Sequence, residues 1–280
     1  MKRLCVIGDP IEHSRSPLIQ NAMIRAAGLD YVYDARRVAG TDTAQWLRQA
    51  GEEGYVGFNA TMPHKENLVS LVDELCGDAA LFRSVNTVSI RKGRVYGFNT
   101  DAEGFLQALR QAGMDPAGKA VLVLGAGGAA KAVVSKLLQA QAKRVTVANR
   151  TRERAQALCA QLGQPGLTVC GFAPDDLKRH AAHSRLVVNC TSLGMTGTAG
   201  QFEDFGFLDE LGPDAGVYDL IYSPAQTELL KQAAGLGLKT SNGLGMLVWQ
   251  GVYALEHFTQ AGLDKSAMAA AAYRALEGLA

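Results

Sequence analysis

Ala120-Val-Leu-Val-Leu-Gly-Ala-Gly-Gly-Ala-Ala130 carries an apolar, branched segment directly into a cluster of glycines. The segment predicts a strand, the glycines predict a tight turn, and the pattern after them predicts a helix that begins at the turn. The spacing matches G-x-G-x-x-A, in which the N–H groups and the positive dipole end of a helix hold a pyrophosphate. The turn residues are Gly125, Ala126, Gly127, Gly128 and Ala129. Alone the motif is weak, because any glycine-rich turn between a strand and a helix resembles it.

The next predicted strand, which ends at residue 149, indicates which dinucleotide would bind. Folds that bind NAD usually place Asp or Glu at the end of this strand, where the carboxylate accepts hydrogen bonds from the ribose 2′-hydroxyl. Here Asn149 stands at that place and Arg150 follows it. A carboxylate would repel a 2′-phosphate, whereas arginine donates several hydrogen bonds to phosphate oxygens. The pattern therefore favours NADP, with Arg150 and Arg154 as phosphate ligands. Alternatively, the arginines are only the solvated face of the following helix, which is the better interpretation of Arg152.

The composition is that of an ordinary protein of two domains. Its basic residues are clustered locally, which implies a small anionic ligand. The 280 residues suffice for two domains, and 48% of them are hydrophobic, which is enough for sizeable cores. A net charge of +1 argues against nucleic acid or a membrane surface as a partner. Five scattered cysteines without a C-x-x-C pair predict a reducing compartment with neither disulfides nor a metal site. No signal peptide or apolar run of about 18 residues is visible, so we expect a cytoplasmic protein.

Alternating strand and helix patterns predict an α/β fold with parallel sheets and helices on both faces. In the first part, strands fit near 3–8, 31–38, 55–59, 85–90 and 94–98, and helices near 17–28, 41–50, 66–76 and 101–113. In the second part, strands fit near 120–124, 144–148, 167–170, 185–189, 216–221 and 238–240. The segment 245–280 fits two helices.

Because the dinucleotide unit begins in mid-chain, the residues before it must form a domain of their own. We expect the C-terminal helices to return to that domain, which makes it discontinuous. The expected division is a substrate-binding catalytic domain of residues 1–103 and 243–280 and a Rossmann-type NADP domain of residues 104–242. Substrate and cofactor would meet in a cleft between the two.

Two hydroxyls follow the first strand, in Gly8-Asp-Pro-Ile-Glu-His-Ser-Arg-Ser-Pro17. Pro17 disfavours helix at the residue before it, so the segment from Ser14 to Ser16 is expected to be extended. Residues two apart on an extended chain point the same way, which directs both hydroxyls to one side and suits a carboxylate or polyol ligand. Ser16 alone fits equally well as the N-cap of a helix that starts at Pro17.

In Gly57-Phe-Asn-Ala-Thr-Met-Pro-His-Lys-Glu66, Asn59 and Thr61 alternate at the end of a strand. Pro63 is expected to open a helix, which puts Lys65 in its first turn. A cation there faces the positive end of the helix dipole, which favours loss of its proton and suits a general acid or base. An ordinary surface lysine is the alternative.

Asp101 follows in Asn99-Thr-Asp-Ala-Glu-Gly104, where Thr100 and Glu103 have the spacing of a capping box. An acidic residue in the first turn of a helix is favoured for purely structural reasons. A nearby Asp101 carboxylate would also hold the proton on Lys65, which opposes the effect of the helix on that lysine. The sequence leaves open which effect is larger.

Two residues near the end of the chain complete the set of candidates. Tyr222 follows the strand near 216–221, at the carboxyl edge where ligands of such sheets bind. Gln250 shares a helix face with Leu247 and Ala254, and an amide on an apolar stripe needs a partner. A substrate hydroxyl and a backbone group are both candidates for that partner.

The order of motifs from end to end resembles that of the shikimate dehydrogenase family. The matching pieces are the glycine turn, Gly8-x-Pro10-x-x-His13-Ser14-x-Ser16-Pro17, Asn59-x-Thr61-x-Pro63-x-Lys65-Glu66, Val85-Asn86-Thr87, Asn99-Thr100-Asp101-x-x-Gly104, Asn149-Arg150-Thr151-x-x-Arg154-Ala155, Asn189-x-Thr191-x-x-Gly194-Met195 and Gly243-Leu-Gly-Met-Leu-Val-x-Gln250. Each piece is short, but together and in order they make a specific signature. The resemblance implies NADP-dependent, reversible reduction of 3-dehydroshikimate to shikimate in aromatic amino-acid biosynthesis.

Carried over residue by residue, the resemblance implies that Lys65 and Asp101 are the catalytic pair. The implied contacts for the substrate carboxylate and hydroxyls are Ser14, Ser16, Asn59, Thr61, Asn86, Tyr222 and Gln250. Besides the glycine turn, the implied contacts for the cofactor are Asn149, Arg150, Thr151, Arg154, Asn189, Thr191, Leu220 and Gly243. A monomer or a homodimer is expected.

The chain departs from the family pattern at four positions. Asn242 stands where Asp is common, Gly77 where some members have an acidic residue, Ala60 where Val is usual, and Trp249 where small or polar residues are usual. Trp249 adjoins the proposed substrate ligand at the next position, so substrate preference is the property most exposed to these changes.

Two other functions remain open at this point. An enzyme of the same kind could oxidise quinate or an amino-shikimate with either cofactor, and a relative without turnover could act as a ligand sensor. Arg150 argues against NAD. Retention of both Lys65 and Asp101 argues against a sensor.

Overall fold

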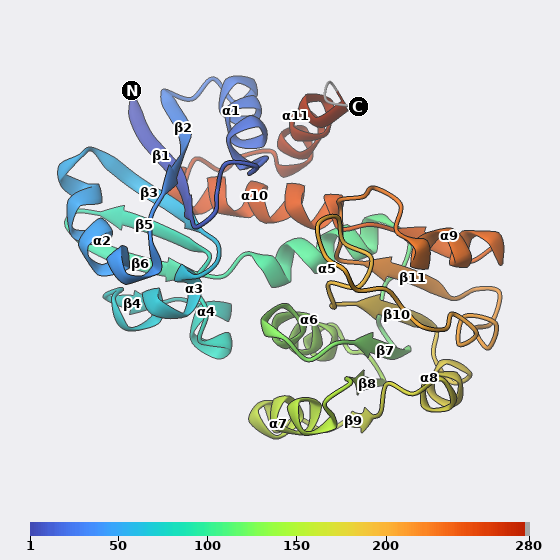
Figure 1. The fold of residues 1–280 in the computed structure, drawn as a ribbon. Helices are drawn as coiled ribbons and strands as arrows, with labels where there is room; N and C mark the ends of the chain where they lie inside the picture. The colour runs from blue at the N-terminus through green and yellow to red at the C-terminus, as the bar shows by residue number, and fades with distance from the viewer. Residues whose placement is uncertain (278–280) are drawn as a thin grey trace. The chain divides into compact units, whose positions relative to one another are not determined.

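The computed structural model describes residues 1–277 of the chain. The chain divides into two compact units: Met1–Gly104 with the residues from Leu247 onward form the first, and Phe105–Met246 form the second. Both divisions fall inside helices, within α5 (Asp101–Gln111) and α10 (Leu244–Thr259). Each unit is built around a six-stranded sheet of its own (Figure 1).

In the first unit the sheet has the strand order β2-β1-β3-β5-β6-β4. Its strands are β1 (Lys2–Gly8), β2 (Tyr31–Arg37), β3 (Tyr55–Ala60), β4 (Glu74–Leu75), β5 (Thr87–Arg91) and β6 (Arg94–Phe98). The helices are α1 (Ser16–Ala26), α2 (Thr43–Glu52), α3 (His64–Asn67), α4 (Asp78–Phe82) and α11 (Lys265–Glu277), with parts of α5 and α10. Each strand predicted in this part of the sequence is confirmed, whereas β4 was not predicted.

The first sheet is mixed, so the prediction of a parallel sheet is wrong here. β1 pairs in parallel with β2 and β3, whereas β5 runs antiparallel to both β3 and β6. The connection between β5 and β6 consists only of Lys92 and Gly93, which have φ angles of 49° and 76°. Two consecutive residues with positive φ make a tight hairpin turn, and so short a loop joins only antiparallel strands.

The helix predicted over 66–76 is also wrong. α3 ends at Asn67, a short 3-10 turn follows over Leu68–Ser70, and β4 then pairs in parallel with β6. The N–H of Val95 in β6 donates to the Asp73 carboxylate over 2.7 Å, and the Asp73 N–H donates to the Val95 carbonyl over 2.9 Å. These hydrogen bonds to β6 take the place of the hydrogen bonds that a helix would make in this segment.

The C-terminal helices are part of the first unit's core. α11 packs along α1, as Figure 1 shows at the top of the molecule. Glycines let α10 approach its neighbours closely, since a Cβ at Gly104 would lie 2.5 Å from the Gln250 nitrogen, and one at Gly57 2.6 Å from the Phe258 ring. Gln20 in α1 donates to the Gly251 carbonyl in α10 over 2.9 Å.

The second unit holds a wholly parallel sheet with the strand order β12-β11-β10-β7-β8-β9. Its strands are β7 (Ala120–Leu124), β8 (Arg144–Ala148), β9 (Leu167–Cys170), β10 (Leu186–Asn189), β11 (Gly216–Asp219) and β12 (Lys239–Ser241). Its helices are α6 (Gly128–Gln139), α7 (Arg152–Leu162), α8 (Pro174–Ala181) and α9 (Glu228–Gly235). α6 and α7 lie on one side of the sheet and α8 and α9 on the other (Figure 1).

This strand order is that of a Rossmann-type fold, which confirms the predicted α/β class. The order reverses between β7 and β10, and ligands of such sheets bind beyond the carboxyl ends of the strands at that point. The strands predicted at 120–124, 144–148 and 167–170 have the predicted bounds. Their apolar residues, such as Leu122 and Val147, are fully buried in the core of the unit.

Candidate active site

Lys65 and Asp101 form an ion pair in the first unit. Lys65 lies in α3, shortly after β3 ends, and Asp101 is the first residue of α5. The Lys65 Nζ donates a hydrogen bond to Asp101 Oδ2 over 2.6 Å, and the two side chains are 30% and 20% exposed. A bonded cation and carboxylate that a ligand can reach are able to pass a proton to or from a substrate oxygen.

The helix that carries Lys65 is much shorter than the sequence suggested. α3 is a single turn of four residues, His64–Asn67. A helix dipole sums over aligned peptide units, so one turn places little positive potential on Lys65, and the helix argument for its chemistry does not hold. The interaction that the structure shows at this ammonium group is the ion pair with Asp101.

His64 anchors the turn that carries Lys65. Its ring is fully buried, with Nδ1 2.8 Å from the Thr43 hydroxyl and Nε2 2.9 Å from the Val38 carbonyl. A carbonyl only accepts hydrogen bonds, so Nε2 carries a proton and donates it to Val38. Burial lowers the pKa of His64, which favours the neutral ring. No pattern in the sequence singled out His64, although it stands next to Lys65.

Asn86 holds the second oxygen of the Asp101 carboxylate. Its Nδ2 donates to Asp101 Oδ1 over 2.8 Å and to the Thr100 hydroxyl over 3.0 Å. Its Oδ1 accepts from the Thr100 N–H over 2.8 Å, and the side chain is buried. One Asp101 oxygen is thus bonded to Lys65 and the other to Asn86, which fixes the orientation of the carboxylate.

Asn59 belongs to the scaffold behind this pair. Its Oδ1 accepts from the Tyr33 hydroxyl over 2.7 Å. Its Nδ2 donates to the Thr87 hydroxyl over 2.9 Å and to the Asn86 carbonyl over 3.1 Å. Since both amide hydrogens have protein acceptors, Asn59 positions its neighbours in this state of the molecule. Neither Tyr33 nor Thr87 was among the predicted site residues, and the only signal for Thr87 was its place beside Asn86.

The segment from Ser14 to Ser16 is not extended, so that prediction is wrong. Arg15 has helical dihedral angles (φ −82°, ψ −5°) and is the N-cap of α1, in which Ser16 is already the first residue. The turn is closed by bonds from the Ser14 N–H to the Ile11 carbonyl over 3.0 Å and from the Ser16 N–H to Ser14 Oγ over 3.3 Å. The alternative interpretation of Ser16 as the N-cap is therefore also wrong.

Three further candidates in the first unit keep groups for a ligand. The hydroxyls of Ser16 and Thr61 have no hydrogen-bond partner within residues 1–277. Gln250 Nε2 donates to the Leu247 carbonyl of its own helix over 2.9 Å, which is one of the two partners that the sequence left open. Its Oε1 keeps its capacity to accept a hydrogen bond from a ligand hydroxyl.

The glycine turn joins β7 to α6 in the second unit. Gly125 has a φ of 105°, which side chains rarely adopt, and a Cβ there would lie 3.0 Å from Thr191. By contrast, no atom lies within 4 Å of where Cβ atoms of Gly127 and Gly128 would stand. α6 runs for 12 residues from Gly128, so the first N–H groups of a long helix adjoin open space beside the turn. That arrangement suits a phosphate group.

A second cationic feature follows β8. Asn149 Nδ2 donates to the Thr151 carbonyl over 2.8 Å, and the Arg154 N–H donates to the same carbonyl over 3.0 Å, which shapes the turn into α7. Arg150 and Arg154 are exposed, and neither forms an ion pair with a carboxylate in the described part of the chain. Unpaired guanidinium groups at this edge of the sheet fit a 2′-phosphate.

Asp219 connects the loops that follow β10 and β11. Its buried carboxylate accepts from Asn189 Nδ2 over 2.9 Å, from the Ile221 N–H over 3.0 Å and from the Thr227 hydroxyl over 2.7 Å. Burial raises the pKa of Asp219, while these hydrogen bonds act to lower it. Asp219 was not among the predicted site residues, although an acidic residue at the end of an apolar strand was the available signal.

The remaining cofactor candidates lie at the ends of β10, β11 and β12 and in the loops that follow them. Asn189 is fully buried, and its Oδ1 accepts from the N–H and the hydroxyl of Thr191 over 3.0 and 2.7 Å, so its side chain shapes the loop after β10. Gly243 lies directly against Leu220, whose carbonyl oxygen would be 1.9 Å from a Cβ at that glycine. Tyr222 is partly buried just beyond β11, at the carboxyl edge of the sheet.

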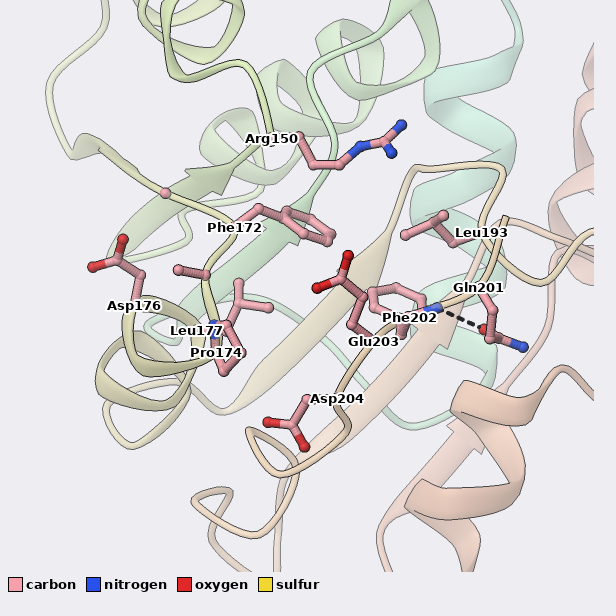
Figure 2. Close-up of a pocket in the computed structure, with 12 residues that line it drawn as sticks. Arg150, Phe172, Pro174, Asp176, Leu177, Leu193, Gln201, Phe202, Glu203 and Asp204 are labelled. Carbon is pink, nitrogen blue, oxygen red and sulfur yellow. Dashed lines mark hydrogen bonds between the residues drawn. The ribbon is translucent and has the colours of Figure 1, made fainter. Parts of the chain in front are cut away.

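A cavity of about 360 Å³ opens beside Arg150 in the second unit (Figure 2). Its apolar lining comes from Phe172, Pro174, Leu177, Leu193 and Phe202, and its acidic lining from Asp176, Glu203 and Asp204. Open glycine positions, a helix N-terminus, unpaired arginines and an apolar cavity are the features that a phosphorylated dinucleotide needs, so these residues fit NADP.

The described residues contain no cluster of side chains that suits a metal ion. Within residues 1–277, no group of three or more His, Cys, Asp or Glu side chains could hold a metal ion. The cysteines are unpaired, and burial raises the pKa of Cys170 to about 12. Over the same residues, no helix is both long enough and apolar enough to cross a membrane.

Comparison with known proteins finds the same kind of enzyme along the whole chain. The matching family models are the shikimate dehydrogenase substrate binding domain over residues 6–88, shikimate / quinate 5-dehydrogenase over 107–196, and the shikimate 5′-dehydrogenase C-terminal domain over 243–273. A shikimate dehydrogenase (NADP(+)) of Geobacter sulfurreducens is 40% identical over 277 residues, with 96% of each chain covered. One of Methanopyrus kandleri is 41% identical, with 91% of this chain and 89% of that chain covered.

Solved structures of similar fold are enzymes of the same kind. Shikimate 5-dehydrogenase of Thermus thermophilus in complex with NADP(H) and shikimate has a TM-score of 0.84 and 35% identity, and the match covers 98% of this chain and 100% of that chain. Quinate dehydrogenase of Corynebacterium glutamicum in complex with NAD has a TM-score of 0.86 and 30% identity, with 98% and 99% covered.

Proposed function

This chain belongs to the shikimate dehydrogenase family, and from that premise we propose that it catalyses the reversible, NADP-dependent reduction of 3-dehydroshikimate to shikimate. The observation that carries the proposal is the 2.6 Å ion pair between Lys65 and Asp101, whose second carboxylate oxygen is bonded to Asn86. The pair offers a ketone oxygen a proton donor that is itself held in place. The reaction serves chorismate and aromatic amino-acid biosynthesis.

The proposed chemistry needs one proton from the protein. When bound, NADPH supplies a hydride to the carbonyl carbon of the substrate. As negative charge develops on the oxygen, the Lys65 ammonium donates a proton to it, which completes the hydroxyl. Lys65 is then neutral and regains a proton from solvent, to which the pair is partly open. In the oxidative direction neutral Lys65 takes the hydroxyl proton, and Asp101 orients its amine throughout.

The substrate carboxylate and hydroxyls are proposed to contact Ser14, Ser16, Asn59, Thr61, Asn86, Tyr222 and Gln250. The partnerless hydroxyls of Ser16 and Thr61 support this role, because a carboxylate or hydroxyl ligand would satisfy them. Asn59 and Asn86 already have protein partners, so we propose that they act partly by fixing Asp101. Tyr222 belongs to the second unit, and its assignment rests on the family resemblance.

We assign substrate binding to the first unit and NADP binding to the second. The proposed cofactor contacts are Gly125, Ala126, Gly127, Gly128, Ala129, Asn149, Arg150, Thr151, Arg154, Asn189, Thr191, Leu220 and Gly243. Preference for NADP over NAD follows from neutral Asn149 and cationic Arg150 at the end of β8, because neither repels a 2′-phosphate. We further propose a cytoplasmic enzyme that acts as a monomer or a homodimer.

A matrix of steady-state assays tests the proposal: shikimate and quinate as substrates against NADP and NAD, followed by the absorbance of the reduced nicotinamide. We expect the highest kcat/KM for shikimate with NADP. A preference for quinate with NAD would identify an enzyme of the quinate type, and no turnover in any of the four combinations would favour a ligand sensor.

A further inference from the structure

We infer that Tyr33 and Thr87 are positioning residues for the Asp101 carboxylate, which they hold through a buried chain of hydrogen bonds. The chain runs from the Tyr33 hydroxyl through Asn59, Thr87 and Asn86 to Asp101 Oδ1. The inference rests on the proposed reaction and adds to it two residues that are not among the proposed contacts of substrate or cofactor.

Asn86 sets the direction of the hydrogen bonds at the catalytic end of the chain. Its Oδ1 accepts from the Thr100 N–H over 2.8 Å, so the oxygen and the nitrogen of this amide cannot change places. The amide nitrogen therefore faces Asp101 Oδ1, to which it donates over 2.8 Å. The Thr87 hydroxyl lies 2.9 Å from Asn86 Oδ1 and donates to it, because a carbonyl oxygen only accepts.

The same argument applies to Asn59 at the other end of the chain. Its amide nitrogen donates to the Asn86 carbonyl over 3.1 Å, and an amide oxygen in that place would face another acceptor. The nitrogen also donates over 2.9 Å to the Thr87 hydroxyl, whose own proton goes to Asn86. Asn59 Oδ1 then accepts from the Tyr33 hydroxyl over 2.7 Å. Every donor in the chain therefore points from Tyr33 towards Asp101.

Burial makes each link of the chain costly to lose. The four side chains that precede Asp101 are all buried, and at most 7% of any of them is exposed. Burial also raises the pKa of the Tyr33 phenol well above its usual value, so the phenol keeps the proton that it donates. Hydrogen bonds that run in one direction polarise one another in such surroundings, and a buried acceptor without a donor is destabilising. Within residues 1–277, Tyr33 is the one donor to Asn59 Oδ1.

The chain ties the Asp101 carboxylate to the sheet of the first unit. Tyr33 lies in β2 and Asn59 in β3, and β1 separates these two strands in the sheet (Figure 1). With Oδ1 of Asp101 held from the sheet, Oδ2 stays directed at Lys65 Nζ, 2.6 Å away. Loss of a link should therefore slow the proton transfer at Lys65 and have little effect on how tightly the substrate binds.

The test is the single-turnover rate of NADP reduction by shikimate, which product release does not limit, together with KM for shikimate in the full-length protein. Tyr33→Phe removes only the first donor and is expected to lower the rate by about 3-fold to 10-fold, with KM within about twofold of the wild type. Thr87→Val should lower the rate by about 10-fold or more. Thr87→Ser keeps the hydroxyl and should restore the rate to within about twofold of the wild type.

Tyr55→Phe is the matched control. Tyr55 is a buried tyrosine of the same sheet, but its hydroxyl accepts from Arg3 over 2.7 Å and from Arg36 over 2.8 Å, outside the chain. Loss of this hydroxyl should lower the free energy of unfolding and leave the single-turnover rate unchanged. The double variant of Tyr33→Phe with Thr87→Val should be as fast as Thr87→Val alone, because a chain that is already broken at Thr87 no longer connects Tyr33 to the carboxylate.

A single-turnover rate in Tyr33→Phe equal to that of the wild type would overturn the inference. Equal losses in Tyr33→Phe and Tyr55→Phe, or losses that add in the double variant, would also overturn it, because both results indicate a merely structural role. Urea unfolding of the same preparations shows whether each variant is folded, and if Thr87→Val is not, the comparison of Tyr33→Phe with Tyr55→Phe decides. Any of these results with an active wild type contradicts only the chain, whereas an inactive wild type contradicts the proposed function itself.

Discussion

Asn149 and Arg150 place an amide and a cation where a site for NAD would carry a carboxylate. Arg150 makes no ion pair in the described chain, so its guanidinium is not committed to another carboxylate. Arg152 lies two residues further along in α7 and serves as a natural control for the general effect of removing a positive charge.

Arg150→Ala should therefore change the cofactor preference rather than the chemistry. Loss of charged hydrogen bonds to the 2′-phosphate is expected to lower kcat/KM for NADP by about 10-fold to 100-fold, and to change that for NAD by less than about threefold. Steady-state kinetics with both cofactors measure the ratio. Arg152→Ala should leave it close to that of the wild type. An equal loss with both cofactors in Arg150→Ala would contradict the assignment.

Among single residues, the sequence identified those that belong to short motifs. It missed the residues whose hydrogen bonds hold the motif residues in place. Thr100 was expected to cap α5, but its hydroxyl bonds to Asn86, and the Asp101 N–H donates to Asn99 Oδ1 over 3.1 Å. His64 and Asp219 are buried polar groups whose partners come from distant parts of the chain. Such partnerships depend on tertiary packing, and spacing along the sequence does not reveal them.

At the scale of elements, close approach between helices depends on glycine. Gly104 in α5 faces α10, where a Cβ would lie 2.5 Å from the Gln250 nitrogen and 2.9 Å from its Cα. Because those are backbone atoms, a side chain cannot be accommodated by a change of rotamer. Gly51 in α2 provides the opposite case, since nothing lies within 4 Å of its Cβ position.

Gly104→Ala should lower the free energy of unfolding by about 1–3 kcal/mol, because α10 must move away from α5. It should also lower kcat/KM for shikimate, since the displaced residue Gln250 is a proposed substrate ligand. Gly51→Ala should raise the free energy of unfolding by about 0.5–1 kcal/mol, as alanine does within a helix. Urea denaturation compares the two variants. Similar stability of both would show that the α5–α10 contact tolerates a side chain.

Helices and strands were predicted correctly where one hydrophobic pattern dominated the sequence. The predictions failed where a turn or a contact across the sheet determines the structure. Parallel strands buried on both faces, such as β7 and β8, read as unbroken apolar runs with the observed bounds. The hairpin at Lys92 and Gly93 turned the first sheet from parallel to mixed, although its strands were predicted. The Asp73–Val95 bonds replaced a predicted helix by an edge strand, because partners across the sheet outweighed local helical preference.

Across the whole molecule, one buried and two partly buried histidines link stability to pH. Burial is the first cause that lowers the pKa of His64, His180 and His257. Unfolding returns these rings to the ordinary pKa of about 6.5. Below that pH the unfolded chain binds more protons than the folded one, so their contribution to stability is complete above about pH 6.5 and is lost as pH falls.

The wild type should therefore unfold at a lower urea concentration at pH 5.5 than at pH 7.5. His257→Phe removes one of the three rings and keeps an aromatic side chain against Phe98, whose ring is stacked 3.9 Å away. Its urea midpoint should change less between the two pH values than that of the wild type. His13→Gln, at an exposed ring, is the control. If the urea midpoint of His257→Phe changed between the two pH values as much as that of the wild type, His257 would not contribute to the pH dependence of stability.

We propose above that Lys65 supplies the proton in an NADP-dependent reduction. The most direct measurement is kcat for the reduction of 3-dehydroshikimate by NADPH in the wild type and in Lys65→Met, with calorimetric binding of adenosine 2′,5′-bisphosphate as the check that the second unit is intact. We predict a loss in kcat of about 100-fold to 10,000-fold with the binding constant unchanged. Turnover by Lys65→Met within about threefold of the wild type would contradict the account.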